Sequence, residues 1–137
     1  NPLKERIVWE KKKINKKLKI LFVSRNDPFK GTDLLNKFLN YFRLNSERKY
    51  SNTTVYIIGQ KSRLNIPNVK FFGTLSFKET EKIYKETNIF ASFSYLENTP
   101  NVLFEALEAH NIPLVTKVGD CETILKKNQF LFSLCSR

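Results

Sequence analysis

Short apolar runs alternate with amphipathic segments along most of the chain, and this order constrains the fold more than any other feature. The apolar runs have the length of strands and are rich in β-branched and aromatic residues, which favour strands. They predict strands over residues 19–25, 53–59, 69–73, 88–94, 112–116 and 130–132. The intervening segments carry apolar residues at helical spacing, or the Ser76-to-Glu79 spacing of a capping box. They predict helices over 30–43, 76–87, 100–110 and 122–127.

Strands that alternate with helices indicate an α/β fold with right-handed crossovers. The fold expected here is a Rossmann-like, doubly wound parallel sheet with helices on both faces. In such sheets ligands bind beyond the carboxyl ends of the strands. The loops that matter for function are therefore 24–31, 59–62, 73–76, 94–100 and 116–121.

Basic residues outnumber acidic ones by 24 to 13, and the excess is concentrated at the beginning of the chain. Residues 1–19 hold eight Lys or Arg and two Glu, a net charge of +6 out of +11. We expect residues 1–18 to form a basic linker or an N-terminal helix and residues 19–137 to form the domain. The basic segment suits peripheral contact with an anionic membrane surface or, alternatively, with nucleic acid.

Cysteine and histidine are scarce, which argues against several classes of site. Cys121 and Cys135 form no CxxC pair and have no companion histidines, so neither a zinc site nor a disulfide framework is expected. A reducing compartment such as the cytoplasm fits best. His110 is the only histidine, and it falls late in an expected helix, where a structural role is favoured.

The loop "SRNDPFKG" (24–31) has the composition of an anion site. Arg25 and Lys30 flank a proline-containing turn after the first expected strand, and Gly31 begins the next helix. Helix N-termini attract anions through free N–H groups and the helix dipole, and Arg grips phosphate oxygens in bidentate fashion. The alternative is a basic surface loop, since neither GxxxxGK[ST] nor GxGxxG is present.

The stretch "SYLENTPNVLFEALEAHNIPLVT" places Glu97 and Glu105 on either side of a helix start at Thr99-Pro100. Thr suits the cap position and Pro the first helical position. Such carboxylates are explained by complementing the helix dipole, or by acid/base catalysis of the glycosidase kind. A third explanation is a ligand with phosphates for the cations and hydroxyls for the carboxylates, which accept hydrogen bonds. A nucleotide sugar is such a ligand.

These residues together resemble the C-terminal half of the retaining GT-B glycosyltransferases, in particular glycosyltransferase family four. The resemblance covers residues 19–132. It rests on the E-x7-E pattern at Glu97 and Glu105, and on Arg25 and Lys30-Gly31 after the first strand. The segments "VYIIGQ", "VKFFGTLSFKETEKIY" and "PLVT" follow in the order of the family.

The resemblance implies a role for each matching residue. Arg25 and Lys30 would hold the pyrophosphate, Glu97 would contact the transferred sugar and Glu105 would bind the ribose. It also implies that catalysis stabilises the leaving diphosphate, with no metal ion, no other cofactor and no covalent nucleophile. The base is expected near the backbone of Gly73–Leu75. The remaining residues expected to bind the donor are Gly31, Gly59, Asn98, Thr99, Pro100 and Asn101.

The chain also departs from the family pattern. Asn111 stands where the family has Gly after the helix, and we expect Asn111 to take the left-handed conformation there. The segment "VGDCETIL" resembles the family's glycine-rich turn before another Glu but is one residue shorter, so Glu122 receives no role. The acceptor-binding N-terminal domain is missing from this sequence, which we expect to be truncated at both ends and inactive in transfer by itself.

Two other functions remain as alternatives. A nucleotide-sugar epimerase half-domain would need further acids and a His, and the only His is poorly placed. A non-catalytic basic module would bind nucleotides or nucleic acid, but no aromatic-interleaved basic stripe is visible, so nucleic acid is not the expected partner. The sugar, base, acceptor and linkage are not specified by the sequence.

Overall fold

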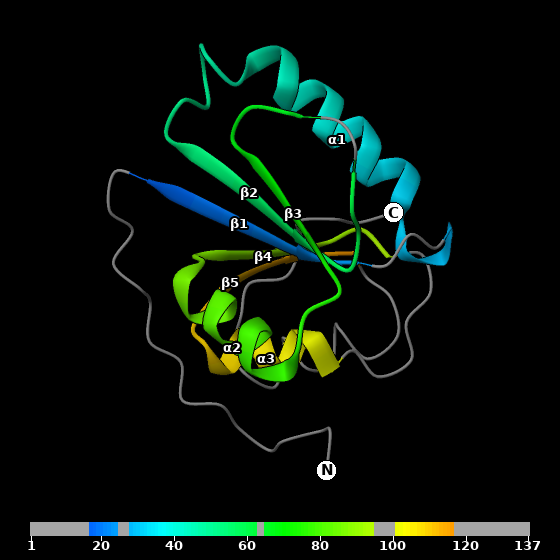
Figure 1. The fold of residues 1–137 in the computed structure, drawn as a ribbon, viewed down its shortest axis with the longest axis vertical. Helices are drawn as coiled ribbons and strands as arrows, with labels where there is room; N and C mark the ends of the chain where they lie inside the picture. Colours follow the sequence, from blue (N-terminus) through cyan, green and yellow to red (C-terminus); the bar gives the residue numbers. More distant parts are fainter. Residues whose placement is uncertain (1–16, 25–27, 63–64, 95–100, 117–137) are drawn as a thin grey trace.

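The computed structural model describes residues 17–24, 28–62, 65–94 and 101–116, which form a five-stranded parallel sheet with helices on both faces (Figure 1). The strand order is β3-β2-β1-β4-β5. The strands are β1 (Leu18–Val23), β2 (Thr53–Ile58), β3 (Val69–Gly73), β4 (Ile89–Ser92) and β5 (Ile112–Val115). The helices are the short 3-10 helix η1 (Pro28–Lys30), α1 (Thr32–Asn45), α2 (Phe77–Glu86) and α3 (Asn101–Glu108). The predicted Rossmann-like α/β fold is therefore confirmed. The elements expected at 122–127 and 130–132 lie outside the described residues.

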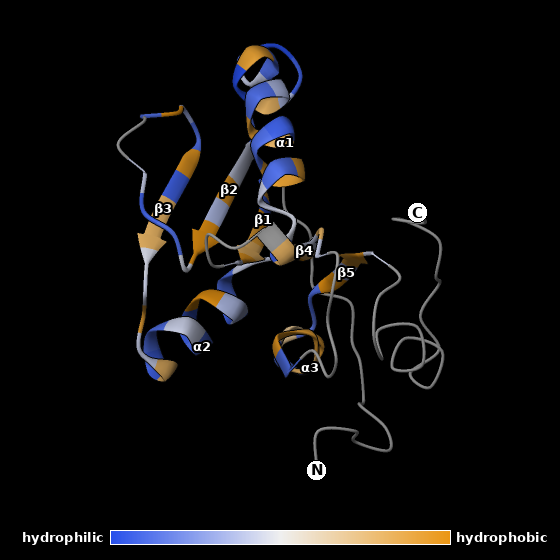
Figure 2. Cartoon of the chain, turned by 90° about the vertical axis from the view of Figure 1, so that its right-hand side faces the viewer, coloured by the Kyte–Doolittle hydropathy of each residue, from blue (hydrophilic) through white to orange (hydrophobic). Residues whose placement is uncertain are grey.

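Each strand sends alternate side chains to opposite faces of the sheet, as the pleat requires. One face packs on α1 and contains Phe22, Ile57 and Ala91. The other packs on α2 and α3 and contains Leu21, Tyr56 and Phe90. Figure 2 shows the apolar sides of the helices turned toward the sheet. The sheet is thus buried on both faces, which explains why its strands are continuous apolar runs.

Phenylalanines fix α1 on its face of the sheet. The ring centroid of Phe22 lies 5.4 Å from that of Phe38 on α1 and 5.2 Å from that of Phe93, which follows β4. These are favourable distances for aromatic pairs. The apolar stripe predicted for α1 is also present, since Leu35, Leu39, Phe42 and the half-buried Phe38 all belong to this core.

The predicted capping box at the start of α2 is confirmed. The Ser76 hydroxyl accepts a hydrogen bond from the Glu79 N–H at 3.2 Å and donates one to the Glu79 carboxylate at 3.0 Å. In the usual box the glutamate bonds the backbone N–H of the cap residue, whereas here it bonds the hydroxyl. The local pattern still determined where the helix begins.

The prediction for the end of α3 was wrong by one residue. Among the described residues other than glycine, only Asn68 and His110 have a positive φ, and the value for His110 is 64°. Asn111 is instead fully buried, and its amide donates to the Tyr84 carbonyl oxygen at 2.9 Å. Its side-chain oxygen accepts from the Thr87 hydroxyl at 2.9 Å. The asparagine therefore joins the ends of α2 and α3, and the histidine makes the turn.

Candidate functional site

The strand order places a topological switch point between β1 and β4. From β1 the chain proceeds to β2 and β3 on one side of the sheet, then crosses to β4 and β5 on the other. The connections that leave the carboxyl ends of β1 and β4 therefore diverge, and doubly wound proteins bind ligands in the crevice between such connections. We call this end of the sheet the carboxyl edge. The loops that carry the predicted site residues leave from it.

The turn that contains Lys30 and Gly31 packs directly against the segment after β4. Gly31 is buried and has a φ of 74°. A Cβ atom at this position would lie 2.1 Å from the Phe93 carbonyl oxygen, so only glycine allows the approach. Lys30, in η1, is half-buried next to this contact. Two loops far apart in the sequence are thus brought together at the switch point.

Phe93, Ser94 and Thr116 fix the start of the second loop, and sequence reasoning missed all three. The Phe93 ring packs on Phe22 while its carbonyl faces Gly31. The buried Thr116 hydroxyl donates to the Ser94 carbonyl oxygen at 2.6 Å. Their pattern in the sequence is that of ordinary strand ends, so only the fold reveals this role. The loop with the predicted Glu97 begins from a well-anchored point.

Five predicted site residues cannot be placed. Arg25, Glu97, Asn98, Thr99 and Pro100 lie outside the described residues, as does Glu122, for which no role was predicted.

Two predicted glycines hold β2 and β3 together at the carboxyl edge. Gly59 and Gly73 have φ values of 101° and 69°. The Gly59 N–H donates to the Gly73 carbonyl oxygen at 2.7 Å, and the Gly73 N–H donates to the Gln60 carbonyl oxygen at 2.8 Å. Leu75, two residues further on, packs its side chain against the core beneath α2 and α3. Its side chain thus serves the fold, and only its backbone is a candidate for ligand contact.

Lys61 is a further cation at this edge that sequence reasoning did not single out. A Cβ atom on Gly73 would lie 2.7 Å from the Lys61 Cε atom, so the lysine side chain lies against the end of β3. The sequence identified the loop 59–62 but gave no reason to select one residue in it. Lys30 and Lys61 are thus two cations in the part of the carboxyl edge that the structure describes.

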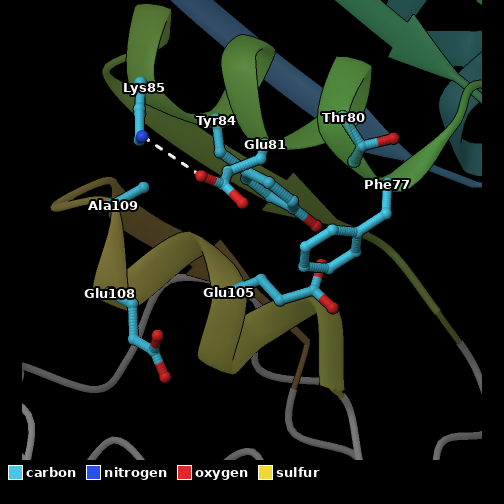
Figure 3. Close-up of a pocket in the computed structure, with 8 residues that line it drawn as sticks. All are labelled: Phe77, Thr80, Glu81, Tyr84, Lys85, Glu105, Glu108 and Ala109. Carbon is cyan, nitrogen blue, oxygen red and sulfur yellow. Dashed lines mark hydrogen bonds and ion pairs between the residues drawn. The ribbon is translucent and has the colours of Figure 1, made fainter.

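Glu105 lines a groove between α2 and α3 with a volume of about 260 Å³ (Figure 3). The helices run in parallel from the carboxyl edge, since each follows a strand that ends there. Glu105 lies one turn inside α3, opposite Phe77 at the start of α2. Glu105 is half-buried against α2, near the end of the groove closest to the carboxyl edge. Asn101, the first residue of α3, is exposed.

Tyr84 closes the floor of this groove. Its side chain is buried, and its hydroxyl donates to the Val102 carbonyl oxygen at 3.5 Å. Burial raises the pKa of the Tyr84 phenol far above its usual value, and the Glu105 carboxylate raises it further through its charge and a hydrogen bond. The phenol is therefore protonated and acts as a donor next to Glu105.

His110 follows the C-terminal end of α3, and the next strand begins at Ile112 beside the start of β4. It is thus at the edge opposite the candidate site. In the part of the chain that the structure describes, no group of three His, Cys, Asp or Glu side chains could hold a metal ion. No helix in that part is long and apolar enough to cross a membrane.

The described site combines cations, left-handed glycines and a carboxylate around one edge of the sheet. This combination suits a ligand with both phosphate and hydroxyl groups. A family model for "Glycosyl transferases group 1" matches residues 4–134. The chain belongs to this family. A sequence search of curated proteins gives no significant match.

Solved structures of glycosyltransferases have the same fold. WaaG, described as a glycosyltransferase involved in lipopolysaccharide biosynthesis, is 20% identical with a TM-score of 0.64 over 82% of this chain. An Escherichia coli trehalose-6-phosphate protein bound with UDP-2-fluoro glucose is 12% identical with a TM-score of 0.63 over 85%. The pneumococcal O-GlcNAc transferase GtfA, in complex with UDP and GlcNAc, is 15% identical with a TM-score of 0.57 over 83%.

The chain spans 32%, 33% and 24% of the lengths of these three structures. At such identities the likeness shows the fold. Together with the family match, it confirms the resemblance to the GT-B glycosyltransferases that the E-x7-E pattern indicated.

Proposed function

We propose that this chain forms the nucleotide-sugar-binding half of a retaining hexosyltransferase. The enzyme would transfer a sugar from its nucleotide donor to a glycan or lipid-linked acceptor, in the synthesis of a surface polysaccharide or glycolipid. The observation that carries this proposal is the contact of Gly31 with Phe93, because it brings the loop with the predicted cations to the start of the loop with the predicted Glu97 at one switch point.

The cations would bind the diphosphate. Lys30 beside the switch point, and Arg25 in the same loop, would neutralise the charge that develops as the nucleoside diphosphate leaves. Preorganised charge of this kind lowers the barrier without a protein nucleophile. The N–H groups at the start of α3, beginning with Asn101, would add a positive dipole from the other side of the crevice.

The carboxylates would bind the hydroxyl groups of the donor. Ionised carboxylates only accept hydrogen bonds, and sugar hydroxyls donate them. Glu105 would accept from the ribose, and Glu97 from the transferred sugar. The base would then lie near the backbone of Gly73–Leu75, where the side chain of Lys61 lies against Gly73.

The proposed reaction needs a second domain that supplies the acceptor. The enzyme would work in the cytoplasm, with the basic N-terminal segment directed toward the inner face of the membrane. We propose no metal ion, since side-chain cations and the helix dipole would take its role. Two of the similar structures contain UDP or a UDP-sugar according to their titles, which supports testing uridine nucleotides first.

A ligand-observed NMR screen of UDP-, GDP- and ADP-sugars against the full chain tests the proposal. At least one nucleotide sugar is expected to bind. Calorimetry on Arg25→Ala, Lys30→Ala and Glu105→Ala then tests the site. Each lost contact to a charged group is worth about 1.5–3 kcal/mol, or roughly 10- to 150-fold in affinity.

Matched control variants come from the opposite edge of the sheet. Lys49→Ala and Glu47→Gln change the net charge as the site variants do, but both residues are exposed in the turn after α1. They are expected to bind the nucleotide like the wild type. Equal affinities for the Arg25, Glu105 and control variants would show that the site is wrongly assigned.

A further inference from the structure

The ring of Tyr84 is enclosed by the core while its hydroxyl faces the proposed ribose-binding carboxylate. We propose that Tyr84 is a positioning residue that holds Glu105 in place and thereby sets the preference of the site for ribonucleotides over 2′-deoxyribonucleotides. This inference rests on the proposed function and names a determinant of its specificity.

Tyr84 is itself held firmly. Only 3% of the residue is exposed, and its ring lies 6.5 Å from the Phe90 ring on β4. Its backbone carbonyl accepts from the Asn111 amide at 2.9 Å. Backbone and ring are therefore both fixed relative to the sheet. The Tyr84 hydroxyl therefore has little conformational freedom, and it can hold a glutamate side chain that has several rotamers.

The hydroxyl has two acceptors, both on α3. The Val102 carbonyl oxygen is 3.5 Å away, at the long limit for a hydrogen bond, and the other acceptor is the Glu105 carboxylate. A hydroxyl has one proton, and an ionised acceptor makes the stronger bond. The proton therefore favours Glu105. A phenol with its ordinary pKa of about 10 is protonated at neutral pH, and burial raises the pKa of Tyr84 further.

The other polar side chains of α2 in this groove have partners of their own. The Glu81 carboxylate pairs with the Lys85 ammonium at 3.1 Å, as Figure 3 shows. The Thr80 hydroxyl donates to the Ser76 carbonyl oxygen at 2.9 Å, within its own helix. Glu108 points away from α2 in the same view. Among these side chains, Tyr84 is the one directed at Glu105.

This contact has a consequence for binding. A half-exposed glutamate samples several rotamers, and ordering it on binding costs free energy. A carboxylate already held by Tyr84 keeps its second oxygen available for a ribose hydroxyl. Loss of the phenol hydroxyl should therefore weaken binding of ribonucleotides selectively and leave binding of the diphosphate unchanged.

The test measures the ratio of the Kd of a 2′-deoxynucleoside diphosphate to the Kd of the matching ribonucleoside diphosphate. The probes are UDP, GDP and ADP, their 2′-deoxy counterparts, and pyrophosphate. For wild type the ratio is expected to be about tenfold or more, because one hydroxyl bonded to a carboxylate is lost. Glu105→Gln is expected to lower the ratio. Tyr84→Phe is expected to lower it about threefold or more, with the affinity for pyrophosphate unchanged.

Thr80→Val is the matched control, because it also removes one hydroxyl from the wall of this groove but breaks only a bond within α2. Its ratio should equal that of wild type. The double variant of Tyr84→Phe and Glu105→Gln should behave like Glu105→Gln alone, since the two residues act as one unit. Incorporation of 3-fluorotyrosine at position 84 keeps the shape and strengthens the donor, so its ratio should match or exceed that of wild type even if Tyr84→Phe folds poorly.

The possible failures are distinguishable. A wild-type ratio in Tyr84→Phe, together with a reduced ratio in Glu105→Gln, would overturn the positioning role and leave the proposed function intact. A 3-fluorotyrosine protein with a reduced ratio would also overturn it. If none of the nucleotides binds to wild type, the proposed function fails and this inference fails with it.

Discussion

Replacement of Gly31 by alanine should destabilise the protein much more than the same replacement of Gly73. Both glycines are left-handed, with φ values of 74° and 69°, so an alanine is strained by a similar amount at either position. They differ in what the new methyl group meets. At Gly31 it meets the Phe93 carbonyl oxygen at 2.1 Å, and at Gly73 it meets the side chain of Lys61 at 2.7 Å.

The magnitudes follow from these neighbours. A left-handed alanine costs about 1–2 kcal/mol, and the stiffer unfolded chain returns about 0.4–1 kcal/mol. Gly73→Ala should therefore destabilise by about 1 kcal/mol, because the exposed Lys61 side chain can move aside. Gly31→Ala adds a clash with fixed backbone, for which overpacking costs are about 1–3 kcal/mol. The total is about 2–4 kcal/mol.

Urea unfolding of the wild type and the two variants measures these values. The difference between the variants matters most, because the backbone strain cancels in it. We expect Gly31→Ala to be less stable than Gly73→Ala by about 1–3 kcal/mol, with similar m values. Equal stabilities would refute the reasoning, since they would mean that the loop after β1 does not pack on Phe93.

Three further predictions concern individual residues. His110→Gly should stabilise the protein by about 0.5–1 kcal/mol by removing left-handed strain. Asn111→Gly should destabilise it by about 2 kcal/mol or more, because the buried Tyr84 carbonyl and Thr87 hydroxyl lose a partner. The reverse order of stabilities in thermal unfolding would contradict the assignment of the turn to His110. Ser76→Ala should cost about 1 kcal/mol in urea unfolding and Ser76→Thr, which keeps the hydroxyl that bonds Glu79, only a few tenths, so a loss as large in the Thr variant would argue against the cap. The raised pKa of Tyr84 contributes stability that is complete below pH 10, the ordinary pKa of a phenol, and is lost as the pH rises above that value. In absorbance titrations, wild type and Tyr84→Phe should therefore differ only once the protein unfolds in alkali. A difference between the two folded proteins near pH 10 would contradict the burial of Tyr84.

Local patterns in the sequence predicted most of the fold. The strand expected at 69–73 is observed as Val69–Gly73, and the helix expected to start after Ser76 starts at Phe77. Such features depend on residues that are neighbours in the chain. Apolar periodicity and capping chemistry therefore identify them without knowledge of the tertiary structure.

Features that depend on distant contacts could not be predicted in the same way. The sequence indicated a left-handed residue after α3, and asparagine is the more usual choice there than histidine. Asn111 was not available for that turn, because its amide bonds Tyr84 and Thr87 on another helix. A long-range bond thus overrode a local preference.

The candidate site shows the same difference between residues identified from local patterns and residues that act through distant contacts. Residue types and spacing selected Lys30, Gly31 and Glu105. The structure places Lys30 in η1, Gly31 directly before α1 and Glu105 in α3, and these elements all begin at the carboxyl edge. The sequence could not select Phe93 or Tyr84, which act through contacts across the sheet and between helices. Their sequence pattern is that of ordinary core residues.

Backbone amide chemical-shift mapping on the ¹⁵N-labelled full chain tests the central claim most directly. On addition of the nucleoside diphosphate that binds in the screen, the shifts should concentrate at the carboxyl edge. The residues concerned are Ser24, Lys30–Thr32, Gly59–Lys61, Gly73–Ser76, Phe93, Ser94 and Asn101–Glu105. Shifts concentrated at the opposite edge, around Thr53, Asn88 and His110, would contradict the account.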